Sequence, residues 1–323
     1  MAEWLYEEGI GENRAILVEG GRIVEASIEL PGAVRAGALV PARLTRILAA
    51  GRGIAALEGG DEALVEPLPE AVAEGGAFLA EIVREAIPEA GRAKLAKVRA
   101  AQGEPRPGPS LADRLGRLTP HGPHGPDRFE EAGWSELLDE AARGEIAFAG
   151  GGLRMSLTPA MTLFDVDGTL PPARLAEAGA AAAAAAIRRL GISGSIGIDL
   201  PTLAGRGERQ AAAAALDRLL PQPFERTAVN GFGFLQVVRR RERASIPEIV
   251  QADPAAAAAR ALLRRAQRGS GPLILHAAPA VAACLAARPD WLAALERQAG
   301  GAVALRPQPG LAISAGHVES RPR

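Results

Sequence analysis

Lysine, cysteine and aromatic residues are scarce in this sequence. Lys94 and Lys97 are the only lysines, so arginine supplies nearly all of the positive charge. The single cysteine, Cys284, excludes an internal disulfide and any zinc site made only of cysteines within one chain. Aromatic residues make up 3% of the chain, so few side chains are available for stacking on a ligand.

Long apolar runs are also missing. No stretch approaches the roughly 18 apolar residues that a membrane-spanning helix needs, and the longest uniform run, 180–186, is alanine. The first residues include Glu3, Glu7 and Glu8 where a signal peptide would have a basic start. We therefore expect no membrane partner and a cytoplasmic location.

The 323 residues carry a formal net charge of −1, but the charge is unevenly distributed. Residues 1–99 contain 16 acidic and 11 basic residues, whereas residues 206–268 contain 12 arginines and 6 acidic residues. The second stretch is compatible with binding a polyanion, although a solvated helix face would give the same composition. With 48% hydrophobic residues, the chain can form two or three domains with sizeable cores.

The first part of the chain has strand patterns. Residues 14–19 and 22–29 flank Gly20-Gly21 and predict a hairpin. From 37 to about 99, short apolar runs recur with turn residues between them, which is typical of a small β-barrel. Residues 101–128 contain two runs rich in proline and glycine that can form neither helix nor central strand, so we interpret this segment as a linker.

The second part alternates between strand and helix patterns. Strands are predicted at 153–157, 161–166, 195–200 and 232–238, with helices at 175–190 and 206–220. This alternation predicts a sheet whose strands are joined by helical crossovers. A helix at 254–268, a strand at 273–276 and helices at 279–285 and 291–298 predict a small α/β tail.

Three aspartates occupy the ends of two predicted strands. Asp165 and Asp167 are two residues apart, so their side chains should point to the same side of a strand. Asp199 ends a strand that reads as buried, where a carboxylate needs a partner. If the two strands are neighbours joined by the helix at 175–190, all three acids meet at the carboxyl edge of the sheet, where α/β proteins bind ligands.

Clustered carboxylates without cysteine or histidine favour Mg²⁺, with Mn²⁺ as the alternative ion. The competing interpretation is structural. Asp165 and Asp199 would then cap the following helices, and Asp167-Gly168-Thr169 would form a turn.

The run Phe-Asp-Val-Asp-Gly-Thr-Leu at 164–170 resembles the signature motif of haloacid-dehalogenase-type phosphatases. That resemblance implies a nucleophilic Asp165 and an acid/base Asp167. The motif normally opens the domain, whereas more than 160 residues precede it in this chain. The family's later lysine or arginine and acidic pair have poor counterparts, because no lysine follows Lys97 and no Gly-Asp pair follows Asp199.

A longer series of motifs runs through most of the chain. It comprises the hairpin at 14–29, the segment 42–47, the barrel-like stretch to 99, glycines 150–152 leading through Thr158 to Asp165, residues 194–200, the segment 229–241, and a tail with His276 and Pro279. In this order the motifs resemble the ribonuclease E/G family. The resemblance implies an α/β (α+β multidomain) protein with a small OB-type β-barrel near the N-terminus, an α/β catalytic core and a small α/β tail.

The same resemblance implies five parts. Residues 1–38 are expected to form a β-hairpin segment that packs on the core, and 39–100 an OB-fold barrel of RNA-binding type. The linker spans 101–128, the nuclease-like α/β core 129–250, and the small C-terminal α/β domain 251–323.

The resemblance further implies endonucleolytic cleavage of single-stranded RNA by a magnesium-activated water. Asp165 and Asp199 match the family's two metal-binding aspartates, and Asp167 replaces the family's asparagine, which keeps an oxygen ligand and adds charge. The basic segment would hold phosphates through four arginines, namely Arg239, Arg240, Arg241 and Arg243. Solvation of an exposed strand end is the alternative explanation for these arginines.

Three features of the family are missing. Residues 245–254 contain no cysteine, so we expect no zinc link, although a homodimer without zinc remains open. The 5′-end sensor domain is replaced by the linker and about twenty residues around Trp134. The barrel positions that would stack RNA bases are approximated by Ala56 and Val65, in an acidic stretch. Phe232 and Phe234 are expected to lie in the core rather than to stack on bases.

The first interpretation is therefore a reduced, Mg²⁺-dependent endoribonuclease. The second is a noncatalytic RNA-binding or regulatory protein derived from such an enzyme, which the altered barrel and missing sensor favour. A buried acid at Asp199 favours the first, because a protein without metal would gain nothing from burying it. The phosphatase is the third interpretation.

Overall fold

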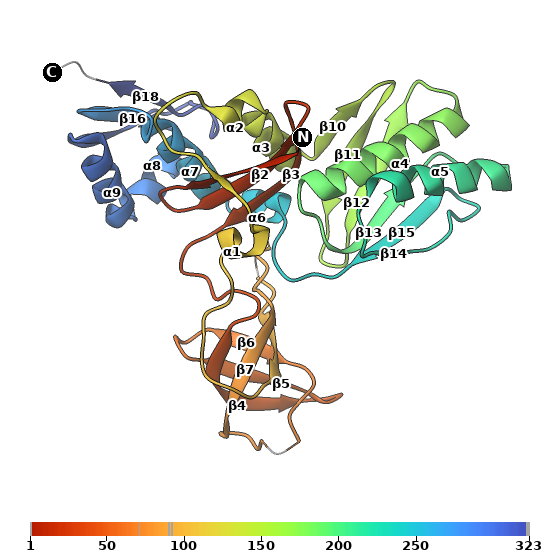
Figure 1. Cartoon of the computed structure of the whole chain (residues 1–323), viewed down its shortest axis with the longest axis horizontal. Helices are drawn as coiled ribbons and strands as arrows, with labels where there is room; N and C mark the ends of the chain where they lie inside the picture. The colour runs from red at the N-terminus through yellow and green to blue at the C-terminus, as the bar shows by residue number, and fades with distance from the viewer. Residues whose placement is uncertain (1, 71, 90, 92, 321–323) are drawn as a thin grey trace.

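The computed structural model describes residues 2–70, 72–89, 91 and 93–320. It contains a mixture of helices and strands, as the sequence predicts, arranged around three open sheets and one closed barrel (Figure 1). None of its helices, within the described ranges, is long and apolar enough to cross a membrane.

The N-terminal sheet is built on the predicted hairpin. Its strands are β1 (Glu3–Glu8), β2 (Asn13–Glu19) and β3 (Arg22–Glu29), in the order β3-β2-β1-β9. Gly20 and Gly21 join β2 to β3 with φ angles of 58° and 77°, the left-handed pair that a tight hairpin requires. The hairpin is therefore confirmed, whereas β1 has no counterpart in the sequence-based assignment.

The segment that was expected to form a small barrel does so. Its five strands close in the order β4-β5-β6-β8-β7, with bounds β4 (Leu39–Leu48), β5 (Arg52–Leu57), β6 (Glu62–Val65), β7 (Ala77–Arg84) and β8 (Ala96–Ala100). The interior is filled by aliphatic side chains that are at most 1% exposed, among them Leu44, Val65, Ile82 and Val98. Small and aliphatic residues at these inward positions explain why a chain with few aromatics can fill the barrel.

The linker is more ordered than the sequence predicts. It contains the one-turn helix α1 (Leu111–Leu115) and the two-residue strand β9 (Thr119–Pro120), which pairs in parallel with β1. Neither element is predicted from the sequence, but α1 lies between the two proline- and glycine-rich runs and β9 is an edge strand, so both agree with the expectation that these runs form neither helix nor central strand. Proline is tolerated in β9 because the strand lies at the edge of its sheet.

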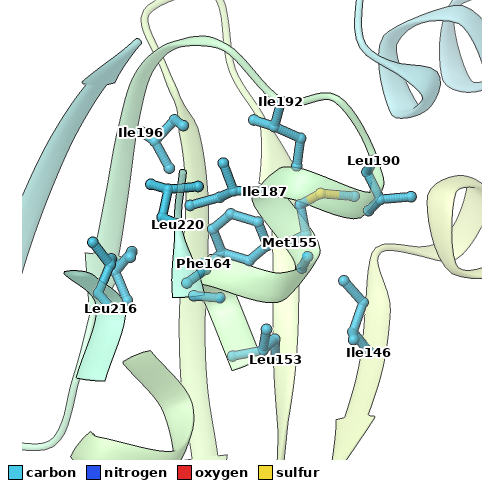
Figure 2. Close-up of a cluster of buried hydrophobic side chains, with 14 of the residues drawn as sticks. Ile146, Leu153, Met155, Phe164, Ile187, Leu190, Ile192, Ile196, Leu216 and Leu220 are labelled. Carbon is cyan, nitrogen blue, oxygen red and sulfur yellow. The ribbon is translucent and has the colours of Figure 1, made fainter. Parts of the chain in front are cut away.

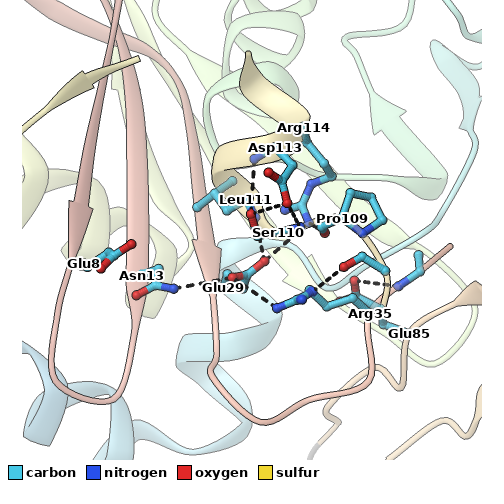
Figure 3. Close-up of polar contacts among 12 residues, drawn as sticks. Glu8, Asn13, Glu29, Arg35, Glu85, Pro109, Ser110, Leu111, Asp113 and Arg114 are labelled. Carbon is cyan, nitrogen blue, oxygen red and sulfur yellow. Dashed lines mark hydrogen bonds and ion pairs between the residues drawn. The ribbon is translucent and has the colours of Figure 1, made fainter. Parts of the chain in front are cut away.

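Glu29, at the end of β3, holds the linker in place (Figure 3). Its carboxylate accepts hydrogen bonds from the backbone N–H of Leu111 at 2.7 Å and from the Asn13 side chain at 3.4 Å. Arg114 and Arg35 lie 3.5 and 3.8 Å from the same carboxylate. One buried acid thus ties the hairpin to α1 and to the entry into the barrel.

The central part is a six-stranded sheet with the order β10-β11-β12-β13-β15-β14. The strands are β10 (Glu145–Phe148), β11 (Gly151–Leu157), β12 (Thr162–Gly168), β13 (Gly194–Asp199), β14 (Glu225–Arg226) and β15 (Phe234–Arg239). Only β12 and β13 pair in parallel, and α4 (Pro172–Arg189) connects them. The crossover unit that the sequence predicts is therefore confirmed.

Helices α4 and α5 (Arg206–Leu219) cover one face of this sheet. Figure 2 shows the resulting core, in which Phe164 and Met155 of the sheet pack beside Ile187 of α4 and Leu216 of α5. Alternate residues along β12 are buried, so the intervening residues point to the other face. Two helices precede the sheet, α2 (Arg128–Glu131) and α3 (Trp134–Arg143).

The C-terminal part is the expected small α/β unit. It consists of α7 (Pro254–Ala266), β16 (Leu273–Ala277), α8 (Pro279–Ala286), α9 (Pro289–Ala299), β17 (Val303–Pro307) and β18 (His317–Ser320). It follows α6 (Ile246–Ala252), whose buried side chains belong to the core of the central sheet. The strand order is β17-β16-β18. Asp253 accepts a hydrogen bond from the N–H of Ala256 and Pro254 follows it, which confirms the predicted start of α7.

A buried ionic cluster connects the N-terminal sheet to α7. Glu12, between β1 and β2, binds Arg260 at 3.0 Å and Arg264 at 2.5 Å, and all three side chains are at most 8% exposed. Arg14 of β2 pairs with Glu7, and burial lowers the pKa of Arg14 to about 10. Because a buried arginine needs its partner, Glu12 stabilises the junction.

Glu12→Gln should therefore destabilise the protein by about 3–5 kcal/mol, because it leaves two buried arginines without their countercharge. The measurement is denaturant unfolding. Glu19→Gln, at the exposed end of β2, is the matched control and should change stability by less than about 0.5 kcal/mol. Equal stability of the two variants would contradict this role of Glu12.

Candidate functional site

The two strands that end in aspartates are neighbours. β12 and β13 run in parallel, and Asp165 and Asp199 are register partners. Adjacent strands lie about 4.8 Å apart, and register partners point to the same side of a sheet. The structure therefore brings Asp165 and Asp199 side by side at the carboxyl edge, as the sequence-based argument expected.

Asp167 lies on the same side as Asp165. Phe164 and Val166 are buried against the helices at 0% and 6% exposure, whereas Asp165 and Asp167 are exposed. This alternation places both carboxylates on the face that α4 and α5 leave uncovered. The i, i+2 part of the prediction is thus borne out by the alternating burial of β12.

The structure corrects the expectation that Asp199 is buried. Ile196, Gly197 and Ile198 are buried, but Asp199 is exposed because it is the last residue of β13 and faces away from the helices. Burial of Asp199 therefore cannot be used as an argument for a bound metal. What remains is the juxtaposition of two exposed carboxylates.

The helix-capping interpretation of these aspartates does not hold. The N-cap residue of α4 is Pro171 and that of α5 is Gly205, so neither Asp165 nor Asp199 occupies a capping position. Within the described residues, no hydrogen bond or ion pair engages the side chains of Asp165, Asp167 or Asp199. Two like charges facing each other across neighbouring strands repel, and a cation between them would relieve that repulsion.

The carboxylate pair suits Mg²⁺ better than a metal that needs a full protein cage. Among the described residues, no group of three or more histidine, cysteine, aspartate or glutamate side chains is arranged to hold a metal ion. Mg²⁺ keeps several of its waters and commonly binds through one or two carboxylates. The pair of Asp165 and Asp199 fits that ion, whereas the three carboxylates with Asp167 do not form such a group.

Two residues extend the carboxylate pair into a row across the sheet. Arg154 of β11 is the register partner of Asp165, and Phe234 of β15 is the register partner of Asp199. A Cβ atom placed on Gly197 would lie 2.6 Å from Cζ of Phe234, so the phenylalanine ring covers that glycine on the uncovered face. Glu145 of β10 is the register partner of Arg154 on its other side, so the order across the sheet is carboxylate, arginine, carboxylate, carboxylate, aromatic ring.

Sequence reasoning did not identify Arg154, and it placed Phe234 in the core. Strand alternation alone puts Arg154 on the face opposite Leu153 and Met155, which are 3% and 4% exposed. That signal predicts an outward-pointing side chain. Its position beside Asp165 follows only from the register of β11 with β12, which the intervening turn sets.

The expectation that Phe232 lies in the core is wrong, because its side chain is 82% exposed. It lies in the turn before β15, and Oδ1 of Asn230 accepts hydrogen bonds from the N–H groups of Phe232 and Phe234 at 2.9 and 3.0 Å. Gly233 has a φ of 95°, and a side chain there would collide with the carbonyl oxygen of Leu200. The turn is therefore well defined, and the ring projects from it into solvent.

The four arginines predicted to bind RNA lie at the other end of the sheet. Arg239 pairs with Gly194, at the opposite end of β13 from Asp199, which corresponds to about 17 Å at the usual rise per residue. Arg240 and Arg243 contact Glu242 at 3.1 and 3.5 Å, and Arg241 pairs with Glu248. The structure does not bring these arginines to the carboxylates.

No protein-family model matches the chain, and no curated protein is significantly similar to it in sequence.

Mg²⁺ should raise the melting temperature of the protein through Asp165 and Asp199. At about 100 times its Kd, a ligand of the folded state adds roughly 2.7 kcal/mol of stability. Asp165→Asn and Asp199→Asn should each abolish that gain. Without divalent cations, Asp199→Asn should be more stable than the wild type by up to about 1 kcal/mol, because it removes the facing like charge.

Differential scanning fluorimetry with and without MgCl₂ makes the measurement. Asp61→Asn, an exposed aspartate between β5 and β6 of the barrel, is the control and should keep the full Mg²⁺ shift. An equal shift in the wild type and both site variants would overturn the assignment of this pair as a cation site.

Proposed function

We propose that this chain is a shortened relative of the ribonuclease E/G family and acts as a Mg²⁺-dependent endoribonuclease on single-stranded RNA. The observation that carries the proposal is the register pairing of Asp165 with Asp199 on neighbouring parallel strands. Both carboxylates are exposed at the carboxyl edge, where a phosphodiester can approach them.

The arrangement along the chain supports the same proposal. A closed five-stranded barrel precedes an α/β sheet that carries the aspartates, and a small α/β unit follows. In the proposal the barrel is of OB type. Its inward residues are aliphatic, and Val65, a counterpart of a family stacking position, is fully buried. The barrel would therefore contribute little to base stacking, and RNA contacts near the carboxylates would matter more.

In the proposed mechanism Asp165 and Asp199 are metal ligands rather than nucleophiles, and Asp167 adds negative charge beside them. When bound, Mg²⁺ would activate a water for attack on phosphorus and offset charge on the phosphate oxygens. The protein's own contribution is to hold two carboxylates in register on a rigid sheet, so that little reorganisation accompanies the reaction. Neither a zinc link nor a 5′-monophosphate preference belongs to the proposal, because the segments for them are missing.

A noncatalytic single-stranded RNA-binding protein is the second candidate. The exposure of Asp199 favours it, because a solvated carboxylate costs little to keep when no metal is bound. This candidate shares the binding surface of the first and differs from it only in lacking cleavage.

Incubating the protein with a 5′-labelled single-stranded RNA, with and without Mg²⁺, tests the two candidates. We expect internal cuts that need Mg²⁺ and fall by at least 100-fold in Asp165→Asn and Asp199→Asn, since each removes a charged ligand. Asp61→Asn should cleave at the wild-type rate. Mg²⁺-independent cleavage, or cleavage that survives both site substitutions, would assign the activity elsewhere, and binding without any cleavage would favour the second candidate.

A further inference from the structure

The face of the six-stranded sheet that α4 and α5 leave uncovered carries the row Arg154, Asp165, Asp199 and Phe234. Register partners on one face follow one another at about 4.8 Å, so the row spans about 14 Å from the first residue to the last. Arg154 supplies a cation, with the exposed Glu145 of β10 as its register partner on the other side, and Phe234 supplies an aromatic ring at the opposite end. A single strand of nucleic acid offers the matching chemistry, because it repeats an anionic phosphate and an apolar base along its length.

Phe232 adds a second aromatic ring beside the row. It lies two residues before Phe234, and N–H of Leu200, which follows Asp199, donates to the carbonyl of Gly233 at 3.2 Å. At 82% exposure, Phe232 is far more exposed than the other large apolar side chains on the described surface, which reach at most 49%. In a chain with 3% aromatics, Phe234 thus lies beside the last residue of β13, and Phe232 lies in the turn that contacts the residues just after it.

The turn that carries Phe232 is suited to presenting a ring to a ligand. Asn230 fixes it through two side-chain hydrogen bonds and accepts another, on its carbonyl, from N–H of Gly233 at 3.2 Å. Oγ1 of Thr202 donates to the carbonyl oxygen of Phe232 at 3.4 Å. Because the backbone of this turn is already held, ordering it costs little when a base stacks on the ring.

Arg154 provides the charge that the carboxylates lack. Its side chain is exposed, and no hydrogen bond or ion pair of the described residues involves it. Arg239, Arg240, Arg241 and Arg243, by contrast, contact a backbone carbonyl or glutamates at the far end of the sheet. A phosphate near Asp165 would therefore meet the guanidinium of Arg154.

We propose that single-stranded RNA binds across this uncovered face, with a base stacked on Phe232 and a phosphate held by Arg154. This inference rests on the proposed function and places the RNA on the sheet rather than in the barrel or on the 239–243 arginines. Phe234 positions the strand between the two contacts, over Gly197.

The test measures binding of a fluorescently labelled eight-nucleotide uridine RNA by anisotropy, in EDTA and in Ca²⁺, so that affinity is read without cleavage. Phe232→Ala should weaken binding by about 5- to 100-fold, the usual loss for one stacked base. It should not weaken binding of an abasic strand of equal length, because that strand has no base to stack. Since Phe232 is exposed, its substitution leaves the core intact.

Arg154→Gln should weaken binding of both strands and reduce the slope of log K against log salt by about 0.7, the contribution of one phosphate contact on a single strand. Two exposed residues outside the six-stranded sheet are the controls, namely Ile313→Ala and Arg22→Gln, and both should bind as the wild type does.

The outcomes separate this inference from the proposed nuclease activity. Phe232- and Arg154-dependent binding without Mg²⁺-dependent cleavage would support the inference and overturn the nuclease. Cleavage and binding that are unchanged in both variants would overturn the inference and leave the nuclease standing. If Phe232→Ala lowered the affinity for the abasic strand as much as the affinity for the uridine RNA, the ring would not stack on a base. Absence of RNA binding by the wild type would overturn both the inference and the nuclease.

Discussion

The parallel pairing of β12 with β13 is the constraint on which the carboxyl edge of the sheet depends. Side chains alternate along a strand, so a slip of one residue would turn Asp165 toward the helices and Phe164 toward solvent. The pairing is held by α4, which crosses the sheet in contact with β12. Gly179 of α4 lies directly against Val166, where any larger residue would collide with the valine side chain. The position of the carboxylate pair is thus set by core packing on the opposite face (Figure 2).

In the structure, the arginines at 239–243 lie apart from the carboxylates of β12 and β13, although the composition suggested one basic surface. Six of the twelve arginines in the basic stretch of the second half fall into two sets. Residues 239–243 turn toward glutamates and a carbonyl at the amino end of β13, and α7 uses Arg260 and Arg264 to enclose Glu12. Arg260 and Arg264 therefore connect distant parts of the chain, whereas Arg240, Arg241 and Arg243 pair with glutamates close in sequence. The cation nearest to Asp165 in register comes from β11, outside the basic stretch.

The sequence predicts the features that follow from local periodicity. The hairpin at Gly20-Gly21, the barrel, the crossover unit and the two adjacent aspartate strands all rest on patterns within a few residues. Features that depend on register or on the last residue of a strand were missed. Asp199 follows three buried residues and so reads as buried, and Phe232 reads as core because it is apolar, whereas the turn at Asn230 directs it outward. β9 and α1 depend on Glu29 and β1, which are distant in sequence.

The exposed features at the carboxyl edge have a common energetic character. Asp165 and Asp199 repel each other in the free protein, and the ring of Phe232 stays in contact with water although its turn is rigid. The repulsion between the carboxylates and the hydration of the Phe232 ring both cost free energy. A bound cation would relieve the repulsion, and an apolar ring stacked on Phe232 would remove its surface from water. A phosphodiester accompanied by a divalent ion and flanked by a base supplies both. The carboxylates and the Phe232 turn belong to one hydrogen-bonded region, β13 with β15, so a single ligand can contact both. A small phosphomonoester at Asp165 would instead leave Phe232 without a partner.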